Sequence, residues 1–121
     1  MSLTVLVADD HHFVRRSIRS LLETDLEIRV VAEAATLEEA MQRTAEFKPD
    51  AVVLDLHMGE ITFEPPEVKA AFAGARLIAI SAWEDEENGI LADTYGAVIL
   101  LDKMTLAQSL IPAIKGQESA N

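Results

Sequence analysis

An alternation of short apolar runs with amphipathic stretches constrains the fold of this chain more than any other feature of its sequence. The alternation repeats five times along 121 residues, and the apolar runs lie at 4–8, 28–34, 51–54, 77–80 and 98–101. Short runs rich in Val, Ile, Leu and Ala are typical of strands buried on both faces of a parallel sheet. The sequence therefore predicts one α/β domain over residues 1–121, with a five-stranded parallel sheet, helices on both faces and right-handed crossovers.

The stretches between the apolar runs have the spacing of helices. In the first, at 12–22, the apolar residues expected to face the core are Phe13, Val14, Ile18, Leu21 and Leu22. Thr36 and Glu39 form a capping box that starts a second helix, expected to end near residue 47. Shorter helices are predicted at 67–72, from the acidic run at 84–87 to Gly96, and from about residue 105 to about residue 114.

The composition limits the classes of function. The formal net charge is −11, from 21 acidic and 10 basic residues, so direct binding to nucleic acid or to an anionic membrane is not expected. The chain has no cysteine, which excludes disulfides, thiolate metal sites and a cysteine nucleophile. No apolar run approaches the ~18 residues of a membrane span, and the first residues show no signal-peptide pattern, so a cytoplasmic location is expected.

Polar residues follow four of the five predicted strands. Asp9 and Asp10 follow the first strand, Asp55 ends the third, Ser81 ends the fourth and Lys103 lies just beyond the fifth. Because the carboxyl ends of parallel strands meet at one edge of a sheet, these side chains are expected to lie close together. Neighbouring carboxylates cannot all stay ionised without a cation, and a site rich in oxygen suits Mg²⁺. Taken singly, each residue has an ordinary role as a turn, a cap or a solvated side chain, but the set favours phosphoryl chemistry.

An ordered set of motifs identifies a family. The motifs lie at 5–11, 14–15, 21–23, 30–34, 38–40, 49–58 and 96–103. Together they resemble the receiver domain of two-component response regulators, over essentially the whole chain. The resemblance implies the flavodoxin-like (βα)5 receiver fold. The first motifs are similar to the subfamily whose receivers precede a helix-turn-helix DNA-binding domain, which implies a role in transcription regulation.

The resemblance assigns roles to the residues at the strand ends. It implies that Asp55 is the phosphoacceptor, and that Ser81 and Lys103 contact the phosphoryl group. The implied cofactor is Mg²⁺. Its implied ligands are the side chains of Asp10 and Asp55 and the backbone carbonyl of His57, with Asp9 assisting.

The resemblance also implies partners and a switch. The phosphoryl donor would be a sensor histidine kinase or a small phosphodonor, and the chain would not be an enzyme that acts on a separate substrate. Phosphorylation would bias a two-state surface around the fourth helix, the fifth strand and the fifth helix, in which Ser81 and position 100 take part. A homodimer is compatible with this reading, and no output domain is expected within the chain.

Departures from the family pattern bear on this switch. Gly59 stands where the family usually has proline, and the following loop at 60–66 lacks the usual glycine. The stretch from Asp55 to Ser81 is also short, which is harmless if only a loop is shortened. Leu100 stands where the family usually has an aromatic residue that rotates inward. We therefore hypothesise that output coupling is weaker in this chain, or that it uses other residues.

Three other functions compete with a phosphorylated receiver. A pseudo-receiver, which binds partners without phosphorylation, is favoured by Leu100 and the altered loop and opposed by the intact acidic residues. A phosphatase with an aspartate nucleophile would need a second aspartate where His57 stands. A flavin-binding domain would need a phosphate loop after the first strand, where the sequence is acidic. His11 and His12 are also candidate metal ligands, but carboxylates and water suit this site better.

Overall fold

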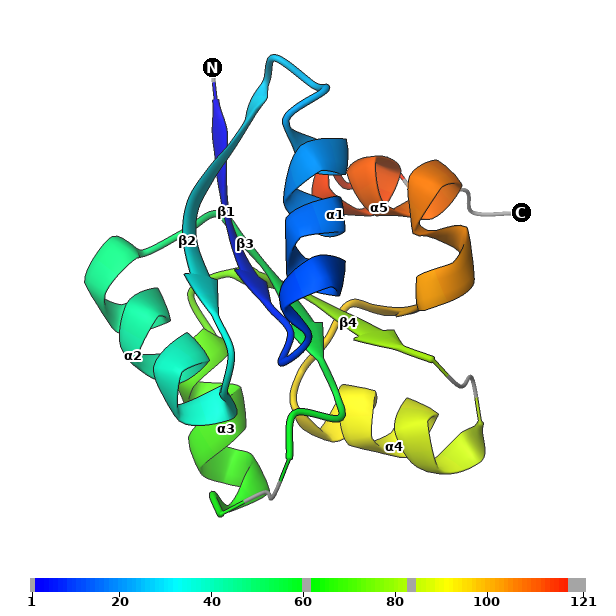
Figure 1. Cartoon of the computed structure of the whole chain (residues 1–121). Coiled ribbons are helices and arrows are strands. Elements are labelled where there is room, and N and C mark those ends of the chain that lie inside the picture. The colour runs from blue at the N-terminus through cyan, green and yellow to red at the C-terminus, as the bar shows by residue number, and fades with distance from the viewer. Residues whose placement is uncertain (1, 60–61, 83–84, 118–121) are drawn as a thin grey trace.

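Each of the five apolar runs forms a strand of one parallel sheet, in the order β2-β1-β3-β4-β5 (Figure 1). The computed structural model describes residues 2–59, 62–82 and 85–117. The strands are β1 (Leu3–Ala8), β2 (Ile28–Ala34), β3 (Ala51–Asp55), β4 (Arg76–Ser81) and β5 (Ile99–Asp102). The central strand β3 is buried at all five positions, as the apolar run at 51–54 predicts, and Asp55 is buried with it.

Helices cover both faces of the sheet, with α1 and α5 on one face and α2, α3 and α4 on the other (Figure 1). The helices are α1 (His12–Leu22), α2 (Leu37–Phe47), α3 (Pro65–Phe72), α4 (Glu86–Thr94) and α5 (Leu106–Ile114), with a short 3₁₀ helix η1 (Lys103–Thr105) before α5. Successive strand residues alternate between the two cores: Val53 packs with α1 and α5, whereas Val52 and Leu54 pack on the opposite face. The predicted fold class is therefore confirmed.

The helix starts follow local signals in the sequence. Thr36 caps α2 by accepting a hydrogen bond from the backbone N–H of Glu39, at 3.1 Å. The Glu39 carboxylate accepts from the N–H of Ala35, one residue earlier than in a standard capping box. Helix α3 begins two residues before the predicted start, because Pro65 and Pro66 fit in a first turn whose N–H groups have no partner within the helix.

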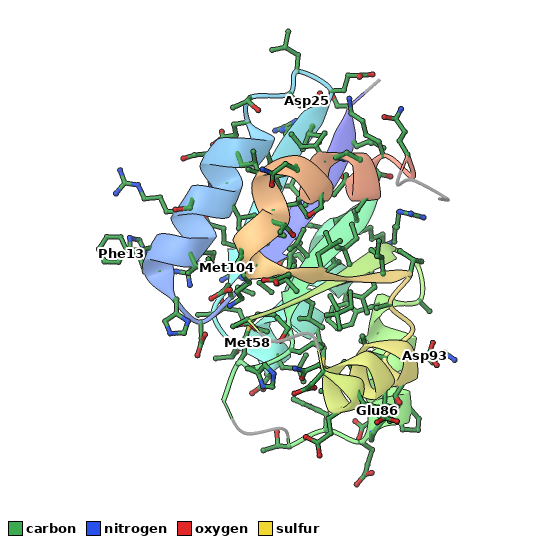
Figure 2. All side chains as sticks on the ribbon, turned by 90° about the vertical axis from the view of Figure 1, so that its right-hand side faces the viewer. Phe13, Asp25, Met58, Glu86, Asp93 and Met104 are labelled. Atoms are coloured by element: carbon green, nitrogen blue, oxygen red, sulfur yellow. The ribbon has the colours of Figure 1, made fainter. Side chains whose placement is uncertain are left out.

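The predicted position of Phe13 on the buried stripe of α1 is wrong. Phe13 is 77% exposed and projects from the helix (Figure 2). The buried stripe of α1 is set by Ile18 and Leu22, with Val14 beside them at the core. Because a helix turns by about 100° per residue, Phe13 is directed well away from Val14 and leaves this stripe.

The register of the sheet brings four strand ends together. Ala8 of β1 pairs with Leu54 of β3, and Leu54 pairs with Ala79 of β4. At the far side, Ser81 pairs with Asp102 of β5. The residues that follow these pairs therefore leave the sheet at one edge.

Candidate functional site

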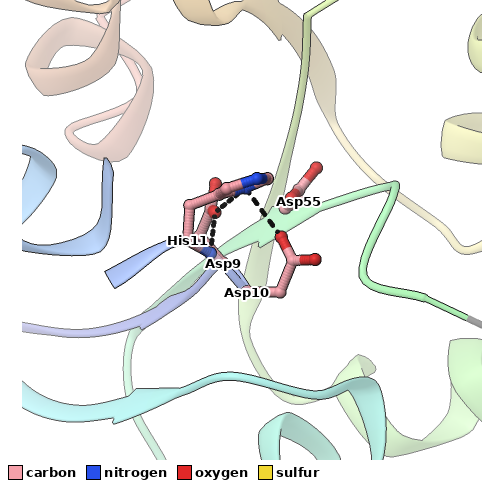
Figure 3. Close-up of side chains that lie close together, drawn as sticks. All are labelled: Asp9, Asp10, His11 and Asp55. Atoms are coloured by element: carbon pink, nitrogen blue, oxygen red, sulfur yellow. Dashed lines mark hydrogen bonds and ion pairs between the residues drawn. The ribbon is translucent and has the colours of Figure 1, made fainter. Parts of the chain in front are cut away.

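Asp9 and Asp55 are buried neighbours at the carboxyl ends of β1 and β3. Asp9 is fully buried, and Asp55 is 3% exposed. Ligand atoms of Asp9, Asp10, His11 and Asp55 all lie within 4.8 Å of one another (Figure 3). The structure thus brings together the three carboxylates that the sequence places at strand ends.

The ammonium group of Lys103 lies beside both buried carboxylates. Its Nζ is 2.8 Å from Asp9 Oδ2 and 3.2 Å from Asp55 Oδ2. Lys103 is the first residue of η1, directly after β5, so its position follows from the end of that strand. Within the described part of the chain, neither of these two carboxylate oxygens accepts a hydrogen bond from any other group.

Backbone N–H groups hold the other oxygen of each buried carboxylate. Asp9 Oδ1 accepts from the N–H of His11 at 2.8 Å, and Asp55 Oδ1 accepts from the N–H of His57 at 3.0 Å. Each bond spans two residues and fixes the carboxylate against the turn that follows its strand. Asp55 Oδ2 therefore faces Lys103 while Oδ1 is held by the backbone.

The site is a poor environment for the negative charge of Asp55. Burial raises the pKa of the Asp55 carboxyl, and the charge of Asp9 raises it further, while the N–H of His57 and the Lys103 ammonium oppose the shift. Burial lowers the pKa of Lys103, but its bonds to Asp9 and its attraction to Asp55 outweigh burial, so the net shift is upward. One ammonium therefore faces more carboxylate charge than it can balance.

Asp10 and His11 form the open side of the cluster. The Asp10 side chain is 38% exposed, and His11 Nδ1 lies 2.9 Å from Asp10 Oδ1 and 3.5 Å from Asp9 Oδ1. His11 therefore lies at the open side of the cluster, with its Nδ1 nearer to Asp10 than to Asp9. His12 contacts Phe13 instead, with ring centroids 5.4 Å apart.

Ser81 lies at the end of β4, fully buried, and is bonded to a residue that the sequence analysis missed. Asn88 Nδ2 donates to Ser81 Oγ at 3.1 Å, and Asn88 Oδ1 is 2.9 Å from His57 Nε2. Asn88 is 4% exposed in the first turn of α4. The signal that would have found it is an asparagine at helical spacing from Ala92 and Tyr95, both of which face the core.

Leu100 lies on β5, partly buried against the core beneath α4. It pairs with Ala79 in the sheet. This position is two residues before the end of β5 and three before Lys103. The role of Leu100 in switching stays a prediction.

The residues at this edge fit a magnesium ion. Mg²⁺ prefers carboxylate and carbonyl oxygens, and three carboxylates gather here. Asp9 and Asp55 each have a buried oxygen whose partner, among the described residues, is the Lys103 ammonium alone. A bound cation would offset the excess negative charge that raises the pKa of Asp55.

Comparison with protein families shows the family of this chain, because the family model of the response regulator receiver domain matches residues 5–115. The chain belongs to this family. The receiver is 36% identical over 111 residues to the transcriptional regulatory protein YhcZ of Bacillus subtilis, covering 90% of the chain and 52% of YhcZ. It is 28% identical over 117 residues to the response regulator VraR of Staphylococcus aureus, covering 95% of the chain and 56% of VraR. The receiver therefore spans about half the length of these relatives.

Solved structures place the receiver in the flavodoxin-like fold of this family. The response regulator domain of Thermotoga maritima CheB matches with a TM-score of 0.83 and 25% identity, covering 97% of this chain and 96% of that one. The signal receiver domain of NarL from Mycobacterium tuberculosis matches with a TM-score of 0.79 and 25% identity, covering 95% and 98%. In the described residues, no helix is long and apolar enough to cross a membrane.

Proposed function

We propose that Asp55 is the phosphoacceptor of this receiver, and that its Mg²⁺-dependent phosphorylation switches the interactions of the domain. The observation that carries the proposal is the environment of the buried Asp55 carboxylate. The Lys103 ammonium lies 3.2 Å from Asp55 Oδ2 and also contacts a second buried carboxylate, that of Asp9. Ser81 ends the neighbouring strand at the same edge. These are the groups that an acyl phosphate on Asp55 needs around it.

Each group has a defined part in the reaction. Asp55 Oδ2 forms a bond to phosphorus while the bond from phosphorus to the donor breaks, and the leaving group takes that electron pair and a proton from solvent. Lys103 would pair with a phosphoryl oxygen, and the Ser81 hydroxyl would donate a hydrogen bond to another. Asp9, Asp10, the Asp55 side chain and the His57 carbonyl would hold Mg²⁺. The bound ion would neutralise phosphoryl charge.

The proposed phosphoryl donor is a sensor histidine kinase or a small phosphodonor. One similar solved structure is the P1 domain of CheA3 in complex with CheY6 from R. sphaeroides, which matches with a TM-score of 0.72 and 25% identity. This similarity supports a kinase domain as partner. The names of YhcZ and of a LuxR-family response regulator from Aurantimonas support a role in transcription regulation. We place this role in the cytoplasm, and the net charge of −11 opposes direct nucleic-acid binding by the receiver itself.

We also propose that a second copy of the receiver is a partner. An apolar groove of about 520 Å³ lies between α1 and α5, and its lining includes Val14, Leu21 and Leu106. Phe13 and Met104, 77% and 86% exposed, stand on the same face (Figure 2). A face that carries both a groove and exposed apolar side chains can pair with itself about a twofold axis. Lys103 also borders the groove, which links this face to the proposed phosphorylation site.

Intact mass after incubation with acetyl phosphate and Mg²⁺ tests the phosphoacceptor proposal. We expect one phosphoryl group to be added to the wild type and none to Asp55→Asn or to the wild type in EDTA. Beryllofluoride, a mimic of the acyl phosphate, should change the fluorescence of Trp83, the only tryptophan in the sequence, and should do so only with Mg²⁺. Asp50→Asn is a matched control, because Asp50 lies at the opposite end of β3 and accepts bonds from Thr4.

The alternative is a pseudo-receiver that binds partners without phosphorylation. Leu100, in place of the usual aromatic residue, is the observation that favours it. No added mass and no fluorescence response to Mg²⁺ and beryllofluoride would support this alternative and overturn the proposal.

A further inference from the structure

The side-chain amide of Asn88 contacts two other polar side chains at the site. Asn88 lies in the first turn of α4 and is 4% exposed. Its Nδ2 donates to Ser81 Oγ at 3.1 Å, and its Oδ1 lies 2.9 Å from His57 Nε2. A buried amide that uses both ends in this way links the end of β4 to the loop after β3.

The direction of these bonds determines the part that each partner plays. Because Asn88 Nδ2 is the donor, the Ser81 oxygen is the acceptor in this bond. Asn88 Oδ1 can only accept, so the His57 tautomer with its hydrogen on Nε2 makes the second bond. The bridge therefore holds the Ser81 oxygen and the His57 ring in place.

The bridge continues to the phosphoacceptor. The backbone N–H of His57 donates to Asp55 Oδ1 at 3.0 Å. A chain of three hydrogen bonds thus runs from Asp55 through His57 and Asn88 to Ser81. The α4 end is itself fixed, because the Asp85 carboxylate accepts from the backbone N–H of Asn88 at 2.8 Å.

We propose that Asn88 is a positioning residue for phosphorylation of Asp55, which holds the Ser81 oxygen at the edge where the phosphoryl group would bind and holds His57 against the site. This inference rests on the proposed function and deepens it. Asn88 does not contact the phosphoryl group, so its effect is exerted through Ser81 and His57. It also makes the start of α4 part of the site, since a displacement of Ser81 acts directly on that helix.

A double-mutant cycle tests this role. The rate of phosphorylation by acetyl phosphate at saturating Mg²⁺ is measured by intact mass for the wild type, Asn88→Ala, Ser81→Ala and the double variant. Asn88→Leu, which keeps the branched shape of asparagine without its polar atoms, provides a second variant in case Asn88→Ala does not fold. Glu87→Ala, exposed on the same turn of α4, is the matched control.

We expect Asn88→Ala to slow phosphorylation roughly tenfold, the effect of about one well-placed hydrogen bond. In the Ser81→Ala background, the same substitution should change the rate by less than about twofold, since the group it positions is gone. Beryllofluoride affinity, followed by Trp83 fluorescence, should fall in parallel with the rate. Glu87→Ala should match the wild type.

Three results would overturn the inference. The effects of the two substitutions on the rate could multiply, which is the behaviour of independent sites and of a residue that only supports the fold. Asn88→Ala could leave the rate unchanged or raise it, which would mean that Asn88 does not position Ser81 or holds it back. A wild type that is not phosphorylated at all would remove the proposed function as well, whereas the first two results would leave that function standing.

Discussion

At the scale of single residues, Asp55 carries a conflict between its chemistry and its stability. Its carboxylate must be ionised to act as a nucleophile, yet burial and the charge of Asp9 raise its pKa. Lys103 and the N–H of His57 reduce this penalty without removing it. Such local instability is common where a site is arranged for reaction rather than for folding.

Asp55→Asn should therefore raise the free energy of unfolding near pH 7 in the absence of Mg²⁺. The folded state binds the Asp55 proton more readily than the unfolded chain, so the ionised group lowers stability as the pH rises above its ordinary pKa of 3.8. The gain should be present at pH 7 and should disappear as the pH falls below that value. Urea unfolding in EDTA measures it, and added Mg²⁺ should stabilise the wild type more than the variant. A less stable Asp55→Asn protein at pH 7 would contradict the argument.

The pKa of Glu33 is shifted in the opposite direction to that of Asp55. Its pKa is raised by burial, but Arg19 and Arg15 outweigh burial and lower it overall. Arg15 Nε lies 3.0 Å from Glu33 Oε1, and Arg19 Nη1 lies 2.7 Å from Oε2. These pairs join α1 to β2, the edge strand.

Glu33→Gln should lower the free energy of unfolding by about 1 kcal/mol at pH 7, the upper range for a partly exposed ion pair. A lowered pKa means that the contribution is present above the ordinary value of 4.5 and is lost as the pH falls through the lowered value of the folded state. Urea unfolding of the wild type and the variant at pH 7 measures the stabilisation by ionised Glu33, and the same measurement near pH 3 measures its loss. Glu46→Gln, exposed on α2, is the control and should not destabilise the protein. An equal loss at both pH values would show that packing, not charge, explains the effect.

At the scale of secondary structure, the sequence predicts strands better than helix faces. All five strands were expected within two residues of their observed ends, because apolar runs of this length have few alternatives. Phe13 was wrongly assigned to the buried face of α1 because it is apolar and directly precedes Val14, and residue type alone does not show that it points away from the core. Asn88 was not predicted because it reaches the site from a helix, whereas the residues predicted for the site lie at or just after strand ends.

The strand β5 provides a prediction of its own. Leu100 packs partly buried beside Ala79 and has no polar end that favours an exposed state. We expect beryllofluoride with Mg²⁺ to cause only small amide chemical-shift changes across Ile99–Asp102, and larger ones at the start of α4. Leu100→Tyr should enlarge the changes in β5, and β2, at the far edge of the sheet, is the internal control. Large shift changes across β5 in the wild type would contradict the weak coupling that we hypothesise.

At the scale of the whole molecule, the topology determines which residues can meet. Residues 9, 55, 81 and 103 are far apart in the sequence, and their position at one sheet edge followed from the prediction that all strands are parallel. The contacts within the cluster did not follow from it. That Lys103 lies against both Asp9 and Asp55 depends on the turn η1 and on side-chain packing, which the alternation of apolar runs does not specify.

The face between α1 and α5 gives the last prediction. If a second copy of the receiver occupies the groove, sedimentation velocity should show association that increases with Mg²⁺ and beryllofluoride, because Lys103 both borders the groove and contacts Asp55. Phe13→Ser should weaken that association by at least about tenfold, since burying a phenylalanine contributes roughly 1.5–3 kcal/mol. Leu26→Ser is the matched control, because Leu26 is 97% exposed and does not line this groove. Equal weakening by both substitutions would point to non-specific apolar contact, and a wild type that stays monomeric under all conditions would exclude a second copy as the occupant of the groove.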